Sequence, residues 1–201
     1  GGVMGERIEY ICALADENAL VGQTETVMQT DYYFRGEELM LTDDSGETWV
    51  ASGLTTKQLE ETKAVYGQGN MIPENSVYAD GNGMFAVFWG ETPTLHVSKD
   101  DGETWTDFVF QEEYPRLCTS RIVRFLDPEN GYVGLGTDWS MGTGGATYIG
   151  WTHDGGATWE TTPVAVENGW ILSGLAFADQ SAGMLTMDEQ FGENSWPHVL
   201  V

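Results

Sequence analysis

The side chains of this chain that could do chemistry are mainly carboxylates. Aspartate and glutamate make up 32 of the 201 residues, against eight lysines and arginines. The adjacent pairs Asp43-Asp44 and Asp100-Asp101 have the residue types of a glycosidase acid and base or of a Ca²⁺ site. With so many acidic residues, however, close pairs arise from composition alone, and the alternate ligand positions of a Ca²⁺ loop are missing. We expect one member of each pair to belong to a turn and the other to be solvated, and we assign no catalytic residue.

The histidines and glycines do not predict a metal or nucleotide site. His96, His153 and His198 lie on or beside strand-like runs, and no two have the His-x-x-x-His spacing of a metal pair. The glycine-rich run at 134–145 is followed by no helical pattern, so it lacks the helix N-terminus that binds phosphate. No Ser-His-Asp or Cys-His arrangement follows from the spacing. The sequence therefore predicts no metal ligand and no cofactor.

The elements that must position any site follow from an eight-residue pattern, Thr/Ser-x-Asp-x-Gly-x-Thr-Trp, that occurs three times. The copies span residues 42–49, 98–105 and 152–159, so that successive tryptophans are 56 and 54 residues apart. A repeat of this length predicts a repeat architecture rather than one globular core.

Each copy joins two short runs of strand composition, which predicts a β-hairpin. The Ser/Thr and Asp side chains can accept hydrogen bonds from backbone N–H groups of the turn, and the glycine can adopt a positive φ. The tryptophan can pack its ring beneath the hairpin. These structural residues are Thr42, Asp44, Gly46, Trp49, Ser98, Asp100, Gly102, Trp105, Thr152, Asp154, Gly156 and Trp159.

A second repeated element consists of an aliphatic and aromatic strand, an acidic turn residue, and then glycine with further apolar residues. It occurs at 76–87, 122–134 and 175–186, with a poorer copy at 10–22. This pattern predicts a further hairpin in each repeat. The segment 55–65 is the only plausible short helix.

The three eight-residue copies resemble the Asp-box, or BNR, repeat of sialidases, sortilin-type receptors, some glucanases and photosystem-II assembly factors. The resemblance covers about residues 8–201. It implies an all-β fold of the sialidase-like superfamily, in which each repeat is a four-stranded antiparallel blade of a β-propeller. We expect about four blades, at about 8–52, 75–111, 120–163 and 171–201, after a cloning scar or N-terminal extension at 1–7.

The number of blades and their closure stay open at this point. The fourth unit reaches residue 201 before an Asp-box, so the chain is part of a larger propeller, lacks residues beyond 201, or uses its N-terminal segment to complete the last blade. We expect an incomplete or open propeller, because an open sheet edge needs protection.

In the families that the repeat resembles, the loops between the second and third strands of the blades form the ligand-binding face, opposite the Asp-boxes. Here these loops are 24–38, 89–94, 137–147 and 188–197. Their aromatic rings can stack on sugar C–H faces while carboxylates bind hydroxyl groups, although packing between blades is the alternative for the rings. The ligand-binding candidates are Tyr33, Arg35, Trp89, Glu91, Asp138, Trp139, Glu189 and Trp196.

Sialidase activity is disfavoured by the arginines. Sialidases hold the substrate carboxylate with three arginines from different blades, whereas Arg116, Arg121 and Arg124 fall within nine residues of one unit, and the Arg-Ile-Pro type motif is absent. The leading hypothesis is a non-catalytic module that binds a glycan or a protein. The alternatives are a glycoside hydrolase or part of one, and an assembly-factor-like propeller that docks on a protein complex.

Composition narrows the partners and the compartment. A net charge of −24 disfavours nucleic acid and anionic lipid surfaces, and no apolar run reaches the ~20 residues of a membrane span. Cys12 and Cys118 lie in different repeats, so we expect two buried free thiols. Bacterial proteins that the repeat resembles act mostly outside the cytoplasm. We therefore expect a secreted or envelope-attached protein whose signal or anchor has been removed.

Overall fold

The computed structural model describes residues 32–60, 72, 74–90, 92–110, 118, 120–137, 146–165, 169–189 and 195–200, and for 60, 74 and 195–200 only the backbone. The structural statements below concern these residues. They form an all-β fold of four antiparallel sheets, with one short α-helix, α2 (Thr56–Glu60), and one 3₁₀ turn, η2 (Glu74–Ser76). The prediction of an all-β chain is confirmed.

Each sheet is a meander in which every strand pairs with the next strand along the chain. Sheets 2 and 3 have the expected four strands, and sheets 1 and 4 have three described strands each. Sheet 1 contains β1 (Tyr32–Arg35), β2 (Glu38–Leu41) and β3 (Val50–Thr55); sheet 2 contains β4 (Val77–Ala79), β5 (Phe85–Trp89), β6 (Thr94–Ser98) and β7 (Thr106–Val109). Sheet 3 contains β8 (Ser120–Phe125), β9 (Gly131–Gly136), β10 (Thr147–Thr152) and β11 (Glu160–Val164); sheet 4 contains β12 (Trp170–Asp179), β13 (Ala182–Glu189) and β14 (Ser195–Leu200).

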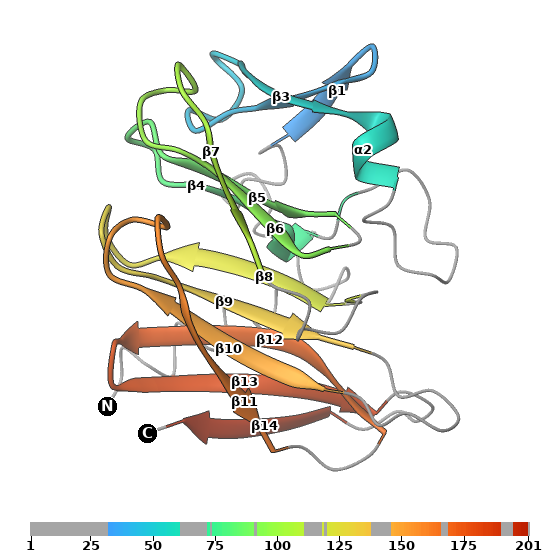
Figure 1. The fold of residues 1–201 in the computed structure, drawn as a ribbon, viewed down its shortest axis with the longest axis vertical. Helices are drawn as coiled ribbons and strands as arrows, with labels where there is room; N and C mark the ends of the chain where they lie inside the picture. The colour runs from blue at the N-terminus through green and yellow to red at the C-terminus, as the bar shows by residue number, and fades with distance from the viewer. Residues whose placement is uncertain are drawn as a thin grey trace.

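The four sheets stack in the order of the sequence, with sheets 1 and 4 at opposite ends of the stack (Figure 1). A separate apolar interior fills each of the three interfaces. Between sheets 1 and 2 it includes Leu39, Leu54, Val77 and Phe85; between sheets 2 and 3, Phe88, Leu95, Val123 and Val133; between sheets 3 and 4, Ile122, Ile149, Leu175 and Leu185. Stability is therefore distributed along the stack, as in a repeat protein.

The central strands are apolar on both faces because both faces are covered. In β5, Phe85 and Val87 face sheet 1, whereas Ala86 and Phe88 face sheet 3. The side-chain period of two thus sends alternate residues of one strand into two different interiors. This explains why the run Phe85–Trp89 shows no alternation of polar and apolar residues.

The predicted helix is present over the described part of the segment 55–65, as α2, and residues 61–65 lie outside the described residues. The Gln58 backbone N–H donates to Thr55 Oγ1 at 3.4 Å, and Gln58 Oε1 accepts from the Thr55 backbone N–H at 3.0 Å. This reciprocal pair is a capping box that starts α2. The helix buries Leu59 in the interior between sheets 1 and 2.

The hairpins of the second repeated element are also confirmed where the structure describes them. They are β4–β5, β8–β9 and β12–β13. In each turn an aspartate accepts a hydrogen bond from the backbone N–H two residues later: Asp80, Asp127 and Asp179, at 2.7, 2.8 and 2.8 Å. The poorer copy at 10–22 lies outside the described residues.

Candidate functional site

The stack has two edges of different character. The three Asp-box patterns form the turns β2–β3, β6–β7 and β10–β11, which we call the box edge. The connections β1–β2, β5–β6, β9–β10 and β13–β14 leave the strands at the opposite ends, which we call the loop edge. Figure 1 shows the β6–β7 and β10–β11 turns on the left of the stack and the β5–β6 turn on the right.

The first box turn is built on two side chains. Thr42 Oγ1 accepts from the Gly46 backbone N–H at 2.9 Å and donates to Asp44 Oδ1 at 2.8 Å. The Asp44 carboxylate accepts from the Thr48 backbone N–H at 2.9 Å and from the Thr48 hydroxyl at 2.6 Å. The indole of Trp49 donates to the Gly46 carbonyl at 3.1 Å. The four polar side chains of the predicted pattern thus each have a partner within the same eight residues.

The second and third box turns contain the same hydrogen bonds at nearly the same distances. Ser98 Oγ and Thr152 Oγ1 accept from the glycine N–H groups at 2.9 and 2.8 Å. The indole-to-glycine distance is 3.1 Å in both, as in the first turn. Three segments far apart in the sequence therefore adopt one local structure.

The backbone of these turns has a feature that the sequence analysis missed. The glycine has a positive φ in each turn, as predicted, at 89°, 77° and 94° for Gly46, Gly102 and Gly156. The preceding residue is left-handed as well, with φ of 63°, 56° and 68° for Ser45, Asp101 and Gly155. The signal was the small or Asp side chain at that position, since Asp and Gly tolerate this conformation best.

The box carboxylates act as fixed acceptors rather than as acids. The Thr48 hydroxyl and backbone N–H, followed by Thr42, lower the pKa of Asp44 to about 2. The equivalent bonds from Thr158 lower the pKa of Asp154 to about 2, and those from Thr104 lower the pKa of Asp100. Hydrogen bonds to the charged form favour that form. At neutral pH these groups hold no proton to donate.

In the first acidic pair the neighbouring aspartate, Asp43, is engaged rather than simply solvated, which corrects our expectation for that pair. Asp43 Oδ2 accepts from the Gly83 backbone N–H of the β4–β5 turn at 2.9 Å. The Asp101 backbone N–H donates to the Gly83 carbonyl at 3.0 Å. The Asp43 carboxylate and the Asp101 backbone therefore both contact the β4–β5 turn, while the Asp101 residue is exposed.

The variable second position of each box pattern also contributes to contacts between neighbouring sheets. Asp43 joins sheet 1 to sheet 2 through the bond just described. Lys99 Nζ donates to the Asp154 carbonyl of sheet 3 at 3.0 Å. His153 Nδ1 lies 2.9 Å from Asn130 Oδ1, which also accepts from Gln180 of sheet 4 at 2.6 Å. The box edge is thus a connected structural surface.

The described ligand-binding candidates lie in separate surroundings. The Tyr33 ring, 39% exposed, packs edge-on against the Trp49 indole with a centroid distance of 4.4 Å. Arg35 pairs with Glu38 of its own hairpin at 3.1 Å. Trp89 packs against the interior between sheets 1 and 2, and its indole N–H is buried without a hydrogen-bond partner in the described part of the chain.

The structure describes the remaining ligand-binding candidates only in part. Glu189 ends β13, opposite Trp170 of β12. Trp196 lies in β14 and pairs with Met187, with only its backbone described. Glu91, Asp138 and Trp139 lie outside the described residues. Of the four candidates with described side chains, Tyr33 and Arg35 lie in sheet 1, Trp89 in sheet 2 and Glu189 in sheet 4.

Two arginines of the 116–124 cluster bind backbone carbonyls between sheets 2 and 3. Arg121, 2% exposed, donates to the Cys118 and Gly90 carbonyls, each at 2.6 Å, and its burial lowers its pKa. Arg124 donates to the carbonyls of Asn75 and Val77 at 3.3 and 3.2 Å. Sequence reasoning did not predict these roles, because the partners are distant backbone groups that leave no residue-type signal.

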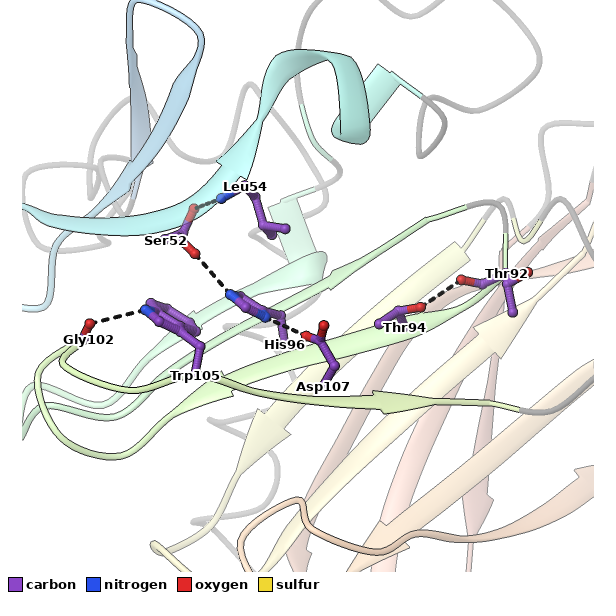
Figure 2. A network of polar contacts seen from close by, with 8 residues as sticks. All are labelled: Ser52, Leu54, Thr92, Thr94, His96, Gly102, Trp105 and Asp107. Atoms are coloured by element: carbon purple, nitrogen blue, oxygen red, sulfur yellow. Dashed lines mark hydrogen bonds and ion pairs between the residues drawn. The ribbon is translucent and has the colours of Figure 1, made fainter.

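Figure 2 shows a polar network between sheets 1 and 2 that centres on His96 of β6. Its imidazole lies between the Asp107 carboxylate and the Ser52 backbone carbonyl, at 2.5 and 2.9 Å. The ring stacks on the box indole Trp105 with a centroid distance of 4.4 Å. His96 is thus a strand histidine with an acceptor oxygen within hydrogen-bond distance of each ring nitrogen.

Metal and membrane features are not found in the part of the chain that the structure covers. No group of three or more His, Cys, Asp or Glu side chains is arranged to hold a metal ion among the described residues. No helix among them is long and apolar enough to cross a bilayer. Cys118 is a buried thiol that forms no disulfide, and Cys12 lies outside the described residues.

No protein-family model matches the chain, and no curated protein sequence shows significant similarity to it.

Proposed function

We propose that the four sheets are blades of an Asp-box β-propeller that is open or incomplete. The shared hydrogen bonds of the three box turns support this proposal, since they occur between the third and fourth strands of sheets 2 and 3. The first strands of neighbouring sheets also contact one another, β4 with β8 and β8 with β12. Such contacts are expected where the inner strands of blades approach a common axis.

The function that we propose is non-catalytic binding of a glycan or a protein partner at the loop edge, in a secreted or cell-surface protein. The observation that carries the proposal is the difference between the two edges. The box edge repeats one turn three times, with its carboxylates already engaged in hydrogen bonds. The loop edge varies from sheet to sheet, with connections of 36–37, 90–93, 137–146 and 190–194.

This difference is what we expect if the box edge is a structural scaffold and the loop edge carries the binding site. Loops of variable length on a rigid frame are where proteins usually place binding residues. The two longer connections contain or adjoin Trp139 and Trp196, whose rings could stack on the C–H face of a sugar. Acidic and amide side chains in the same connections, such as Asp138 and Asn194, could accept or donate hydrogen bonds to hydroxyl groups.

A glycan array probed with the full chain tests the proposal. We expect binding that is lost in Trp139→Ala and Trp196→Ala. Tyr33→Ala is the matched control, because this ring packs on Trp49 and its removal should leave binding intact. Loss of binding in Tyr33→Ala alone would contradict the proposed face.

Further assays on the same full-chain protein separate the alternative functions. Turnover of chromogenic glycosides that disappears on replacement of a single carboxylate would replace this proposal with a glycoside hydrolase. Absence of both glycan binding and turnover, with a defined protein bound in a manner sensitive to Trp139→Ala, would favour the protein-docking alternative.

A further inference from the structure

His96 lies at the interface of sheets 1 and 2, with its side chain 12% exposed. Across the hairpin β6–β7, its Nδ1 is 2.5 Å from Asp107 Oδ1. Across the interface, its Nε2 is 2.9 Å from the backbone carbonyl oxygen of Ser52 in β3 (Figure 2). One imidazole therefore connects an outer strand of sheet 2 with an outer strand of sheet 1.

Both atoms that face the ring are acceptors. A carbonyl oxygen has no proton to donate, and an ionised carboxylate has none either. The Ser52 residue is itself held in place, because its Oγ donates to the Leu39 carbonyl at 2.9 Å and accepts from the Leu54 backbone N–H at 3.1 Å. Neutral imidazole donates from one nitrogen only, whereas imidazolium donates from both. Only the protonated ring can make both hydrogen bonds.

The other surroundings of the ring also favour the cation. The indole of Trp105 lies parallel to the ring, at an interplanar angle of 2°, in the geometry of a cation–π contact. Strands β3 and β5 carry no titratable side chain, and Asp107 is the one such group of β7. The turn after β6 carries Lys99, Asp100, Asp101 and Glu103, and the hydrogen bonds and ion pairs described for these four residues do not involve the ring.

We propose that His96 is a proton-dependent link between sheets 1 and 2. The imidazolium joins the Ser52 carbonyl to the Asp107 carboxylate, and loss of its proton breaks one of these two bonds, because the neutral ring donates from one nitrogen only. Unfolding also breaks both bonds, so the folded chain gains more from the protonated ring than the unfolded chain does. The free energy of unfolding therefore falls when rising pH removes this proton. The link does not depend on the proposed ligand-binding function.

Urea unfolding of the wild type and of His96→Gln, each at pH 5.5 and 8.0, tests the link. The other two histidines are common to both proteins, so their titration cancels in the ratio of the folding equilibrium constants. We expect the wild-type to His96→Gln ratio to fall about fivefold between pH 5.5 and 8.0, since a hydrogen bond to a charged group is lost. An equal ratio at both pH values would overturn the proposal.

Asp107→Asn provides a second variant that leaves His96 in place. The asparagine amide can donate to the neutral Nδ1 while Nε2–H donates to Ser52, so both bonds survive loss of the proton. We therefore expect Asp107→Asn to show a smaller decrease in stability with pH than the wild type. If it retains the full wild-type dependence, the proton does not act through this pair.

Hydrogen exchange locates the effect, after correction for the intrinsic pH dependence of the exchange rates. Protection of the β3 amides should fall at pH 8.0 relative to protection of the β9 amides of sheet 3, and His96→Gln should lack this difference. A uniform change in all sheets would show that the titration does not act at this interface.

Discussion

The packing of one box turn on the neighbouring sheet predicts an unequal cost for two similar glycine substitutions. Gly36 and Gly102 both have left-handed backbones, with φ of 67° and 77°. A Cβ at Gly36 would meet no atom within 4 Å, whereas a Cβ at Gly102 would lie 1.9 Å from Val50 Cγ1 of sheet 1. Gly36→Ala therefore isolates the backbone cost, and Gly102→Ala adds a clash across the interface.

The magnitudes follow from these geometries. A left-handed alanine costs about 1–2 kcal/mol, and the lower entropy of the unfolded chain offsets about 0.4–1 kcal/mol of this. We expect Gly36→Ala to lower the free energy of unfolding by about 1 kcal/mol. Overpacking adds about 1–3 kcal/mol, so Gly102→Ala should cost about 2–4 kcal/mol. Urea denaturation followed by tryptophan fluorescence and circular dichroism measures both values.

A double mutant tests whether the extra cost of Gly102→Ala comes from the contact with Val50. Val50→Ala removes the methyl group that the new Cβ would meet, so Gly102→Ala combined with Val50→Ala should cost about 1–2 kcal/mol less than the sum of the single changes. Equal costs for Gly36→Ala and Gly102→Ala, or additive costs in the double mutant, would refute the packing of the second box turn on sheet 1.

Three further predictions concern the box turns and the thiol. The folded-state pKa of Asp44 and Asp154 is about 2, against an ordinary value of 3.8. Their stabilising effect is therefore present above about pH 4 and is lost as the pH falls toward 2. Asp44→Asn should make this acid-induced loss of stability shallower in urea titrations. Ser45→Gly should stabilise the protein by about 0.5–1 kcal/mol in the same assay, because Ser45 has a φ of 63° where the third box turn has glycine, and no gain would argue against that backbone. Burial raises the pKa of the Cys118 thiol to about 11, so a thiol reagent at pH 8 should modify this residue, identified by peptide mapping, only in urea-unfolded protein.

The box turns were predictable in detail because their chemistry is local. Thr42, Asp44 and Gly46 satisfy one another and the intervening backbone within eight residues, and the same types recur twice more at the same positions. The hairpins with Asp80, Asp127 and Asp179 were predictable for the same reason. A hydrogen bond within a turn depends only on the residue types and on their spacing along the chain, and both can be read from the sequence.

The contacts between sheets could not be predicted in this way. His96 and Ser52 are 44 residues apart, and the group of Ser52 that contacts the ring is its backbone carbonyl, which every residue has. The buried Arg121 likewise binds the carbonyl of Gly90, 31 residues away. Tyr33, taken from the sequence as a ligand residue, packs on Trp49 because the β1–β2 hairpin brings its ring over the first box turn.

The sequence by itself thus determined the turns, the pairing of neighbouring strands and the repeat that generates four similar sheets. All of these depend on residues close together in the chain and on a side-chain period of two. The tertiary structure alone decided which polar groups meet between sheets. Every residue has a backbone carbonyl and nearly every residue a backbone N–H group, so the sequence does not show which of them will be a partner. Their positions depend on how apolar side chains such as Phe85, Val123 and Leu175 set the spacing and rotation of one sheet on the next.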